Sequence, residues 1–290
     1  MKNNNITAGI VLYNPNINRL LKNIESVYQQ VQKIIVFDNG SDNYKEVVKY
    51  LKKFPNVIEI SSSINRGIAY ALNEIAIKAK KMGYDWLLTL DQDTVIRKNL
   101  INTYTKYLNL PQLGQLCCGY EDANLPGSRI GINTNFPEYK VYRVKECITS
   151  GTLMNLKALE NVGGFDEALF IDGVDDEISY LLEENHYFTY KVNFIGMNHE
   201  LGKIDKGRIF SKEIKHSNYG PMRRYYIARN RVILSKRYKK YQPLTTNMIY
   251  QLKDWVTIIL FEHNKHKKSL AIIKGIHDGV KYRKARKKYL

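Results

Sequence analysis

The chain has few cysteines, no long apolar run and no leader sequence that we can recognise. Its three cysteines, Cys117, Cys118 and Cys147, lack metal-ligand spacing, and their odd number gives no disulfide framework. No apolar stretch approaches the ~20 residues that a membrane-spanning helix needs. The polar first residues lead directly into an apolar strand pattern rather than a signal peptide. We therefore expect a protein of the reducing cytoplasm.

Acidic residues are scarce in the C-terminal part of the chain. Residues 203–290 hold 24 Lys and Arg but only 5 Asp and Glu, whereas residues 1–202 hold 21 and 23. The net charge of +17 therefore comes from the C-terminal region. A basic block of this kind binds nucleic acid or an anionic membrane surface, or is simply solvated. No nucleic-acid recognition motif accompanies it, so we predict no nucleic-acid partner.

The first ninety residues alternate apolar runs with amphipathic stretches. We expect strands at 6–13, 33–38, 57–60 and 86–90, with helices at 17–29, 44–53 and 67–82 between them. This order predicts an α/β fold with a mainly parallel central sheet and helices on both of its faces. No Gly-x-Gly-x-x-Gly motif follows the first strand, which argues against an ordinary dinucleotide-binding fold.

Two carboxylates, Asp91 and Asp93, directly follow the apolar run at 86–90. At the carboxyl end of a parallel strand they face the crevice where ligands bind, and hard oxygen ligands suit a divalent cation that holds nucleotide phosphates. A solvated turn is the plainer interpretation. Other polar residues also follow predicted strands, and we expect them at the same rim: Tyr13, Asp38, Asn39, Asn65 and Arg66.

A second acidic cluster, containing Asp172, Asp175, Asp176 and Glu177, begins a predicted helix. Acidic residues at a helix start complement the partial positive charge of the first turn, which explains them without any chemistry. A general base, however, needs a carboxylate that is held near the metal without being bound to it. The cluster is therefore a candidate source of such a base.

Seven motifs lie at 10–14, 37–41, 65–67, 90–93, 165–177, 199–202 and 223–230. Their order and spacing resemble those of the family 2 glycosyltransferases, and most of all their L-rhamnosyltransferase branch. The resemblance implies the GT-A fold, in which a nucleotide-binding α/β half is joined to an acceptor-binding half. We expect the GT-A catalytic domain at residues 1–215 and a C-terminal basic helical region, on the acceptor or membrane side, at residues 216–290.

The resemblance implies a donor and metal site on the predicted rim. Asp38 would accept a hydrogen bond from the imide of uracil or thymine. Asp93 would bind Mn²⁺ or Mg²⁺ together with Asp91 and His199, although a structural role explains His199 as an alternative. The implied donor-binding residues are Tyr13, Asp38, Asn39, Asn65, Arg66, Asp91 and Gln92.

The resemblance also implies a catalytic and an acceptor side. Asp175 would be the general base of a single inverting displacement, with Glu177 orienting or tuning it. Arginine forks and tyrosines in the 223–230 segment suit a diphosphate, while a solvated basic helix explains them equally. A tightly packed strand is the alternative for Gly151 and Thr152. The implied acceptor or diphosphate residues are Gly151, Thr152, Asp172, Arg223, Tyr225, Tyr226 and Arg229.

The predicted activity is transfer of a sugar to a polyprenyl-diphosphate-linked saccharide in bacterial surface polysaccharide synthesis. The resemblance implies L-rhamnose from dTDP-L-rhamnose, with UDP-hexose or UDP-galactofuranose as alternative donors. Leu181 stands where relatives usually have arginine, so the identity of the sugar rests on the resemblance alone. A protein of a different class, a sugar-nucleotide-binding module without turnover, is the other alternative.

Apolar residues repeat at helical spacing near the C-terminus, among them Leu252, Trp255, Val256 and Ile259, with lysines around them. A basic amphipathic helix with a tryptophan suits an anionic membrane surface. We therefore predict peripheral attachment to the inner face of the cell membrane. In the alternative arrangement this stripe packs on the catalytic half or on a second subunit of a homodimer.

Overall fold

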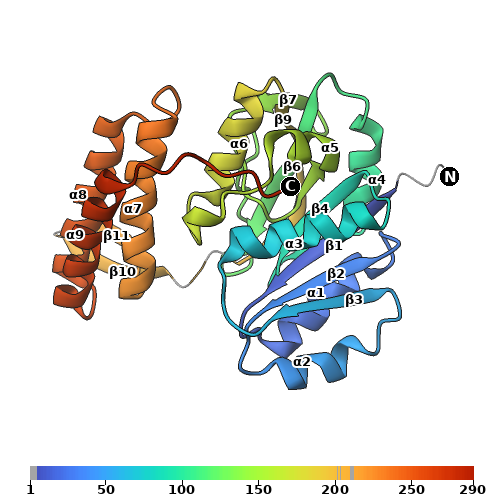
Figure 1. Cartoon of the computed structure of the whole chain (residues 1–290), viewed down its shortest axis with the longest axis horizontal. Coiled ribbons are helices and arrows are strands. Elements are labelled where there is room, and N and C mark those ends of the chain that lie inside the picture. The colour runs from blue at the N-terminus through green and yellow to red at the C-terminus, as the bar shows by residue number, and fades with distance from the viewer. Residues whose placement is uncertain (1–4, 201, 203, 210–211) are drawn as a thin grey trace.

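The computed structural model describes residues 5–200, 202, 204–209 and 212–290. Within these residues a nine-stranded sheet has the order β3-β2-β1-β4-β8-β6-β9-β5, with β7 paired to β9 (Figure 1). Its strands are β1 (Ile6–Leu12), β2 (Ile34–Asn39), β3 (Val57–Ser62), β4 (Trp86–Asp91), β5 (Val95–Ile96), β6 (Leu113–Asp122), β7 (Val141–Val144), β8 (Thr152–Asn155) and β9 (Phe188–His199).

The first four strands are parallel, as their alternation with helices predicts. β1 pairs with β2 and β4, and β2 pairs with β3. Beyond β4 the sheet is mixed, since β8 runs antiparallel to both β4 and β6, whereas β6 and β9 are parallel. The reversal arises because the chain enters β8 beside the carboxyl end of β4, where Gly151 N donates to Thr89 O at 2.8 Å.

Helices cover both faces of the sheet, so the central strands are apolar on both sides. On one face, α1 inserts Leu20, Ile24 and Val27, whose spacing places them on a single helical stripe. On the other face, α3 inserts Leu72 and Ile75. Each such side chain contributes about 2 kcal/mol when it is fully buried. The helices of this half are α1 (Ile17–Tyr28), α2 (Tyr44–Leu51), α3 (Ile68–Lys81), α4 (Leu100–Tyr104), α5 (Leu156–Val162) and α6 (Val174–Glu184).

A second group of elements lies beside the sheet (Figure 1). It contains the antiparallel hairpin β10 (Ile204–Ile209) and β11 (Lys212–Ser217), followed by α7 (Pro221–Arg237), α8 (Leu244–Phe261) and α9 (Lys265–Lys281). Two glycines of α9 let it approach α7 closely: a Cβ on Gly279 would lie 2.7 Å from Arg229 O, and one on Gly275 would collide with Tyr225 O. The hairpin packs against Phe261 of α8, so by contact it belongs with these helices.

A buried carboxylate holds the helical group together. Glu262, at the end of α8, is 1% exposed and accepts from Arg224 of α7 at 2.5 Å and from Lys268 of α9 at 2.8 Å. Arg224 also donates to the carbonyl of Ser217 at the end of β11 at 2.6 Å. Paired in this way, the buried charges fix the mutual positions of four elements.

The chain after α9 returns to the half of the molecule that contains the nine-stranded sheet, which corresponds to the catalytic half expected from the sequence (Figure 1). There Arg286 donates to the buried carboxylate of Glu177 at 2.7 Å and to the carbonyl of Val162 at 3.0 Å, and Tyr289 N donates to Gly163 O at 2.9 Å. Arg286 therefore stabilises α6 and is not available to a membrane.

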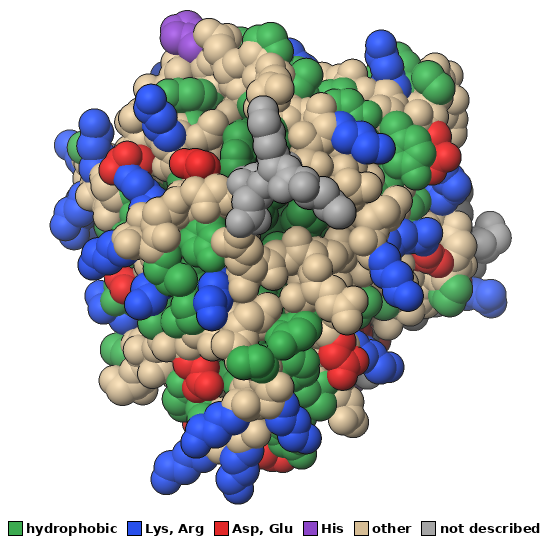
Figure 2. All heavy atoms as spheres, turned by 90° about the vertical axis from the view of Figure 1, so that its right-hand side faces the viewer, with side chains coloured by type: hydrophobic (Ala, Val, Ile, Leu, Met, Phe, Trp, Pro, Cys, Tyr) green, Lys and Arg blue, Asp and Glu red, His purple; other side chains and the backbone are tan. Residues whose placement is uncertain are grey.

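The face of the catalytic half that points away from the helical group carries basic and acidic side chains side by side (Figure 2). This mixture agrees with the near-balanced charge of the first 202 residues. Over the part of the chain that the structure describes, no helix has both the length and the apolar character needed to cross a bilayer.

Candidate active site

A buried carboxylate with one unused oxygen lies at the end of β2. Asp38 is 1% exposed, and its Oδ2 accepts from the backbone N–H groups of Gly40 at 3.2 Å and Ser41 at 3.0 Å. Its Oδ1 is buried without a hydrogen-bond partner. A buried acceptor of this kind is costly unless a donor reaches it. The arrangement therefore suits a ligand that presents an N–H group.

The loop after β3 depends on Asn39. The Asn39 amide donates to Asn65 Oδ1 at 3.1 Å and to Gly67 O at 3.2 Å, while its own carbonyl oxygen accepts from Arg66 N at 2.9 Å. The Arg66 guanidinium lies over the ring of Tyr70 at 3.8 Å. Asn39 and Asn65 thus shape the loop, and Arg66 is the group that the loop offers to a ligand.

The side-chain amide of Gln92, like that of Asn39, forms hydrogen bonds with backbone groups. Its Oε1 accepts from Tyr13 N at 2.9 Å, and its Nε2 donates to Tyr13 O at 3.3 Å. This exchange ties the end of β1 to the loop after β4. Gln92 therefore acts as a brace, and the half-exposed ring of Tyr13 is what the rim presents to solvent.

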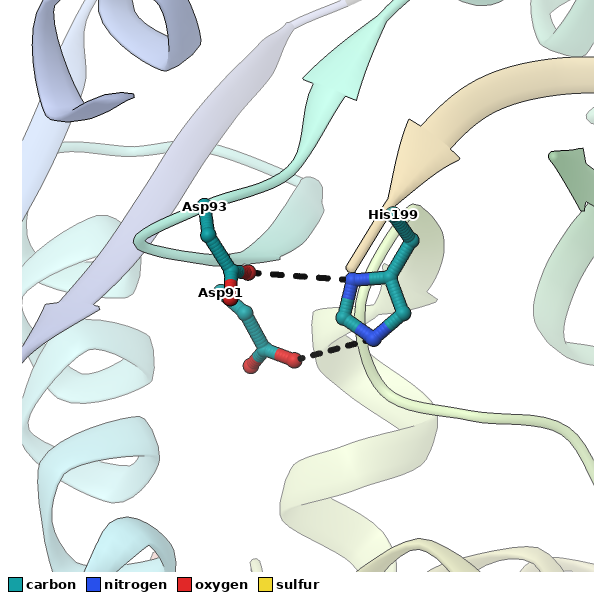
Figure 3. Close-up of side chains that lie close together, drawn as sticks. All are labelled: Asp91, Asp93 and His199. Atoms are coloured by element: carbon teal, nitrogen blue, oxygen red, sulfur yellow. Dashed lines mark ion pairs between the residues drawn. The ribbon is translucent and has the colours of Figure 1, made fainter. Parts of the chain in front are cut away.

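Asp91, Asp93 and His199 point toward one another from two elements, the end of β4 with its following loop and the end of β9 (Figure 3). Asp91 Oδ2 lies 3.9 Å from His199 Nε2, and Asp93 Oδ1 lies 3.8 Å from His199 Nδ1. The two distances end on different ring nitrogens, of which one can bind the ion, but one donor atom from each of the three residues lies within 4.8 Å of the others, close to the ~4.2 Å that two ligands at ~2.1 Å from one ion can span. Asp93 Oδ1 is also buried without a hydrogen-bond partner. The three residues therefore fit a divalent cation.

Two hydroxyl groups orient two residues of the candidate metal site, His199 and Asp91. Thr94 Oγ1 lies 2.8 Å from His199 Nδ1 and 2.7 Å from Ser150 Oγ, which in turn accepts from Asp91 N at 3.0 Å. Such hydrogen bonds fix the plane of a ligating imidazole. The sequence analysis missed Thr94 and Ser150, although each stands immediately beside a motif that it used.

Asp175 lies in the first turn of α6 and accepts a hydrogen bond from the hydroxyl of Thr149. Loss of solvent raises the pKa of this carboxyl well above its usual range, and the negative charges of Asp91 and Asp176 raise it further. The Asp91 charge acts on Asp175 because the two carboxylates face the same space. Asp175 is thus a carboxylate of increased basicity beside the candidate metal site.

A strained loop precedes α6 and is held by one amide. Phe170 and Asp172 have positive φ angles, 65° and 63°, which cost a non-glycine residue about 1 kcal/mol or more. The side-chain amide of Asn230 in α7 donates to the carbonyls of Leu169, Ile171 and Asp172 at 2.8, 2.9 and 2.8 Å. Asn230 therefore stabilises the loop that places the base, and no pattern in the sequence indicated this role.

A family model described as "Glycosyl transferase family 2" matches residues 7–214. The chain belongs to glycosyl transferase family 2. The candidate metal ligands, Asp91, Asp93 and His199, and the candidate base, Asp175, all lie inside the matched region. The resemblance given by the sequence motifs is confirmed.

This glycosyltransferase is similar over nearly its whole length to a curated relative, dTDP-rhamnosyl transferase RfbF of Shigella flexneri. The identity is 28%, covering 94% of this chain and 96% of the relative. Among solved structures it is similar to S. aureus TarS 1-349 in complex with UDP-GlcNAc, with a TM-score of 0.62, 12% identity, and coverage of 95% of this chain and 80% of that one. GalNAc-T7 with UDP, GalNAc and Mn²⁺ gives a TM-score of 0.58 and 16% identity, covering 69% and 44%. The structural likenesses confirm the GT-A fold.

Only some of the predicted acceptor residues face the site of the glycosyltransferase. Arg223 makes a two-pronged ion pair with Asp172, at 3.1 and 2.9 Å. Loss of solvent raises the pKa of Asp91, and the positive charge of Arg223 offsets a small part of that rise. Tyr225 instead donates to Asp278 of α9 at 2.8 Å, and Arg229 donates to the carbonyl of Ala168. Tyr225 is turned toward α9, whereas Arg229 is turned toward the 3-10 turn at residues 167–169.

Three further residues pack within the structure. Tyr226 stacks on Phe170 at 4.8 Å, next to the loop that leads to the base. Gly151 has a φ of +73°, and a Cβ there would collide with Met197, while Thr152 is buried and donates to Ile148 O at 2.7 Å. These contacts favour the packed-strand interpretation of Gly151 and Thr152.

Glu177 lies away from the base. Its carboxylate is buried and accepts from Tyr238 at 2.8 Å as well as from Arg286. On a helix, positions i and i+2 diverge by ~200°, so Glu177 faces the protein interior while Asp175 faces the rim. Its contacts are those of a structural residue rather than of a group that tunes Asp175.

We predict that Mn²⁺ binding depends on this trio and on its orienting hydroxyl. Asp93→Ala should weaken Mn²⁺ at least ~100-fold, and Thr94→Val should weaken it roughly 10-fold because the imidazole loses its anchor. Isothermal titration calorimetry measures both. Asp85→Ala, at the opposite end of β4, is the control and should bind as wild type. Undiminished binding by Asp93→Ala would remove this residue from the metal site.

Proposed function

We propose that this glycosyltransferase is metal-dependent and inverting, and that it moves L-rhamnose from dTDP-L-rhamnose to a lipid-linked saccharide of a bacterial surface polysaccharide. One observation carries the proposal: a metal-fitting trio lies at the ends of β4 and β9, and a carboxylate of raised pKa in the first turn of α6, Asp175, interacts with the charge of Asp91. The full-length similarity to a protein named as a dTDP-rhamnosyl transferase supports the donor. UDP-hexose and UDP-galactofuranose are the alternative donors.

The proposed base-recognition group is Asp38. Its unused Oδ1 accepts the imide N–H of thymine or uracil, a group that cytosine lacks. Arg66 and the ring of Tyr13 lie on the neighbouring loops and contact the rest of the nucleotide. The donor is thereby fixed by the loops after β1, β2 and β3.

The diphosphate lies beside the trio of Asp91, Asp93 and His199. These residues would hold Mn²⁺ or Mg²⁺, which when bound offsets the charge that develops on the departing diphosphate. Arg223, already fixed by Asp172, adds a positive charge on the same side of the site. The leaving group is thus surrounded by fixed charges rather than by water.

Asp175 supplies the proton acceptor. The acceptor hydroxyl gives its proton to the Asp175 carboxylate while its oxygen forms a bond to the anomeric carbon. The bond from that carbon to the diphosphate oxygen breaks on the opposite face, so the configuration inverts. Because burial and Asp91 raise the pKa of Asp175, the carboxylate is a stronger base than an exposed aspartate.

Thermal unfolding with a panel of nucleotide sugars and Mn²⁺ tests the donor. At 100 times its dissociation constant, dTDP-L-rhamnose should stabilise the protein by about 2.7 kcal/mol relative to the ligand-free form. UDP-glucose, UDP-galactofuranose and GDP-mannose at the same concentration should stabilise it less. Asp38→Asn replaces the free acceptor by an amide donor, so it should weaken dTDP and UDP and improve the relative binding of CDP. The proposal fails if no nucleotide sugar stabilises the protein with or without Mn²⁺.

The pH dependence of transfer should report the base. Transfer requires deprotonated Asp175, so the rate falls as pH decreases through its raised pKa, above the ~4 of an ordinary aspartate. The hydroxyl of Thr149 donates to Asp175 Oδ1, and a hydrogen bond to the charged form of a carboxylate favours that form. Thr149→Ala should therefore shift the rising limb of the pH–rate profile to higher pH, and Thr149→Ser should return it. If the rising limb keeps its position in Thr149→Ala, Asp175 is not the group that accepts the proton.

We further propose that the helical group binds an anionic membrane surface. Leu252, Val256, Ile259 and Ile273 of α8 and α9 are each 46–58% exposed, and an apolar groove of about 580 Å³ runs between α7, α8 and α9. A contiguous exposed apolar surface of this kind marks an interaction site. The surrounding lysines suit acidic headgroups, which places the enzyme beside a lipid-linked acceptor on the inner face of the cell membrane.

Sedimentation with phosphatidylglycerol vesicles tests this surface. The triple variant Leu252→Gln, Val256→Gln and Ile259→Gln should lose most of its vesicle binding, whereas Leu125→Gln, on the catalytic half, should not. Neutral vesicles should bind the wild type more weakly. If the wild type is instead a stable dimer in solution and the triple variant is a monomer, this apolar face binds a second copy of the chain.

A further inference from the structure

The two neighbouring cysteines of β6 point to opposite faces of the sheet. Side chains alternate between the faces along a strand, and Gln115 donates to Ser179 of α6 at 2.7 Å. Cys117, two residues further on, therefore points to the face that α6 covers. Cys118 points the other way and belongs to the apolar core beneath α1. The two thiols thus have different surroundings, although they are adjacent in the chain.

The third cysteine, Cys147, lies close to Cys117. In the antiparallel pairing of β6 with β8, Leu116 stands opposite Leu153. The next residues in this register are Cys117 and Thr152, and the hydroxyl of Thr152 lies 3.5 Å from Cys147 Sγ. Cys147 is partly exposed, whereas Cys117 is buried. One thiol of this pair is therefore accessible to a small reagent, and the other is its buried neighbour.

A lysine lies beside the same pair. Lys191 of β9 stands opposite Cys117 in the parallel register of β6 and β9. Among the residues that the structure describes, Lys191 makes no ion pair with a carboxylate. Reactive cysteines are found in electropositive, partly exposed surroundings of this kind. The positive charge of Lys191 is therefore available to stabilise a thiolate.

The surroundings divide the two thiols into a nucleophile and a proton-bearing partner. A hydrogen bond from the Cys117 thiol lowers the pKa of Cys147 and outweighs burial, which raises it. The charge of Lys191 lowers this pKa further, while that of Glu146 opposes it. Burial raises the pKa of Cys117 well above its usual range, so Cys117 stays protonated. An accessible thiolate with a second thiol next to it is the arrangement of a redox-sensitive cysteine.

We infer that Cys147 and Cys117 form a redox-sensitive modification site whose oxidant is a peroxide. The Cys147 sulfur attacks one peroxide oxygen, the O–O bond breaks, and the other oxygen leaves as hydroxide and is protonated to water. Cys147 is then a sulfenic acid. The Cys117 sulfur attacks the Cys147 sulfur, which forms the S–S bond and releases the second water. Two thiols are thereby oxidised to one disulfide, and one hydrogen peroxide is reduced to two waters.

The segment that this disulfide would hold carries two groups of the candidate active site. Thr149 donates to Asp175, and Ser150 accepts from the backbone N–H of Asp91 at 3.0 Å. The charge of Cys147 also acts on Asp175. An S–S bond of ~2.05 Å draws Cys147 toward β6 and removes that charge. Oxidation therefore slows sugar transfer, and this consequence, unlike the disulfide itself, rests on the proposed function.

Peptide mass mapping on the full chain tests the site. The protein is treated with hydrogen peroxide, unfolded in iodoacetamide and digested. The wild type should contain a disulfide between Cys117 and Cys147 with Cys118 alkylated, and dithiothreitol should return three free thiols. Cys117→Ala should lose the disulfide. Cys118→Ala, the matched control at the adjacent position, should keep it.

The alkylation rate of the native protein tests the proposed nucleophile without any oxidant. At pH 7, iodoacetamide should alkylate Cys147 at least ~10-fold faster than Cys118. Lys191→Gln should slow the alkylation of Cys147 roughly 3-fold, because the thiolate loses its neighbouring cation. Equal rates at Cys147 and Cys118 would overturn the assignment of Cys147 as the nucleophile.

The remaining outcomes separate the disulfide from its effect on transfer. A peroxide-treated wild type with Cys117 and Cys147 still free, or with either of them joined to Cys118, would overturn the site. In oxidised samples the transfer rate should fall roughly 10- to 100-fold and return with dithiothreitol. An unchanged rate in protein that contains the disulfide would overturn the effect on transfer. Absence of transfer by the reduced protein with every nucleotide sugar would instead count against the proposed function and leave the mass map standing.

Discussion

The side-chain amide of Asn230 fixes the loop at residues 169–172, which contacts the start of α3 and leads into α6. Three carbonyls of residues 169–172 converge on this amide, which keeps two non-glycine residues in the left-handed region. The same loop reaches the nucleotide side, where Phe170 O accepts from Ile68 N at 2.7 Å. Its other end continues into α6 and Asp175. A change at Asn230 would therefore move the Arg66 loop and the base together.

Negative charge is concentrated at the rim, and this concentration has a chemical use. Asp91, Asp93 and Asp175 face a common space, and the raised pKa values of Asp91 and Asp175 express partial desolvation and mutual repulsion. Arg223 and His199 offset part of the charge. A divalent cation bound at this excess of negative charge would relieve the electrostatic cost of assembling the site.

The sequence predicts the rim better than it predicts the helix faces. The ends of parallel strands meet at one edge, so a strand pattern alone brings Tyr13, Asp38 and Asp91 together. The direction of a helical side chain depends on what packs against the helix. Tyr225 faces Asp278 of α9, Arg229 faces Ala168 and Glu177 faces Arg286, and none of these partners lies near them in the chain. The sequence motifs also could not reveal that the side-chain amides of Asn39 and Gln92 form hydrogen bonds with backbone groups.

The ion pair between Glu177 and Arg286 imposes an order on the folding of the newly made chain. Arg286 is 109 residues downstream of Glu177, and at ribosomal rates those residues take roughly 5 to 20 s to synthesise. Until then, burying Glu177 would leave a carboxylate without its cation in the protein interior, which is strongly unfavourable. The first four strands can assemble early, whereas α6 takes its final position only when the distal segment arrives. The nucleotide-binding loops would thus form several seconds before the base beside them.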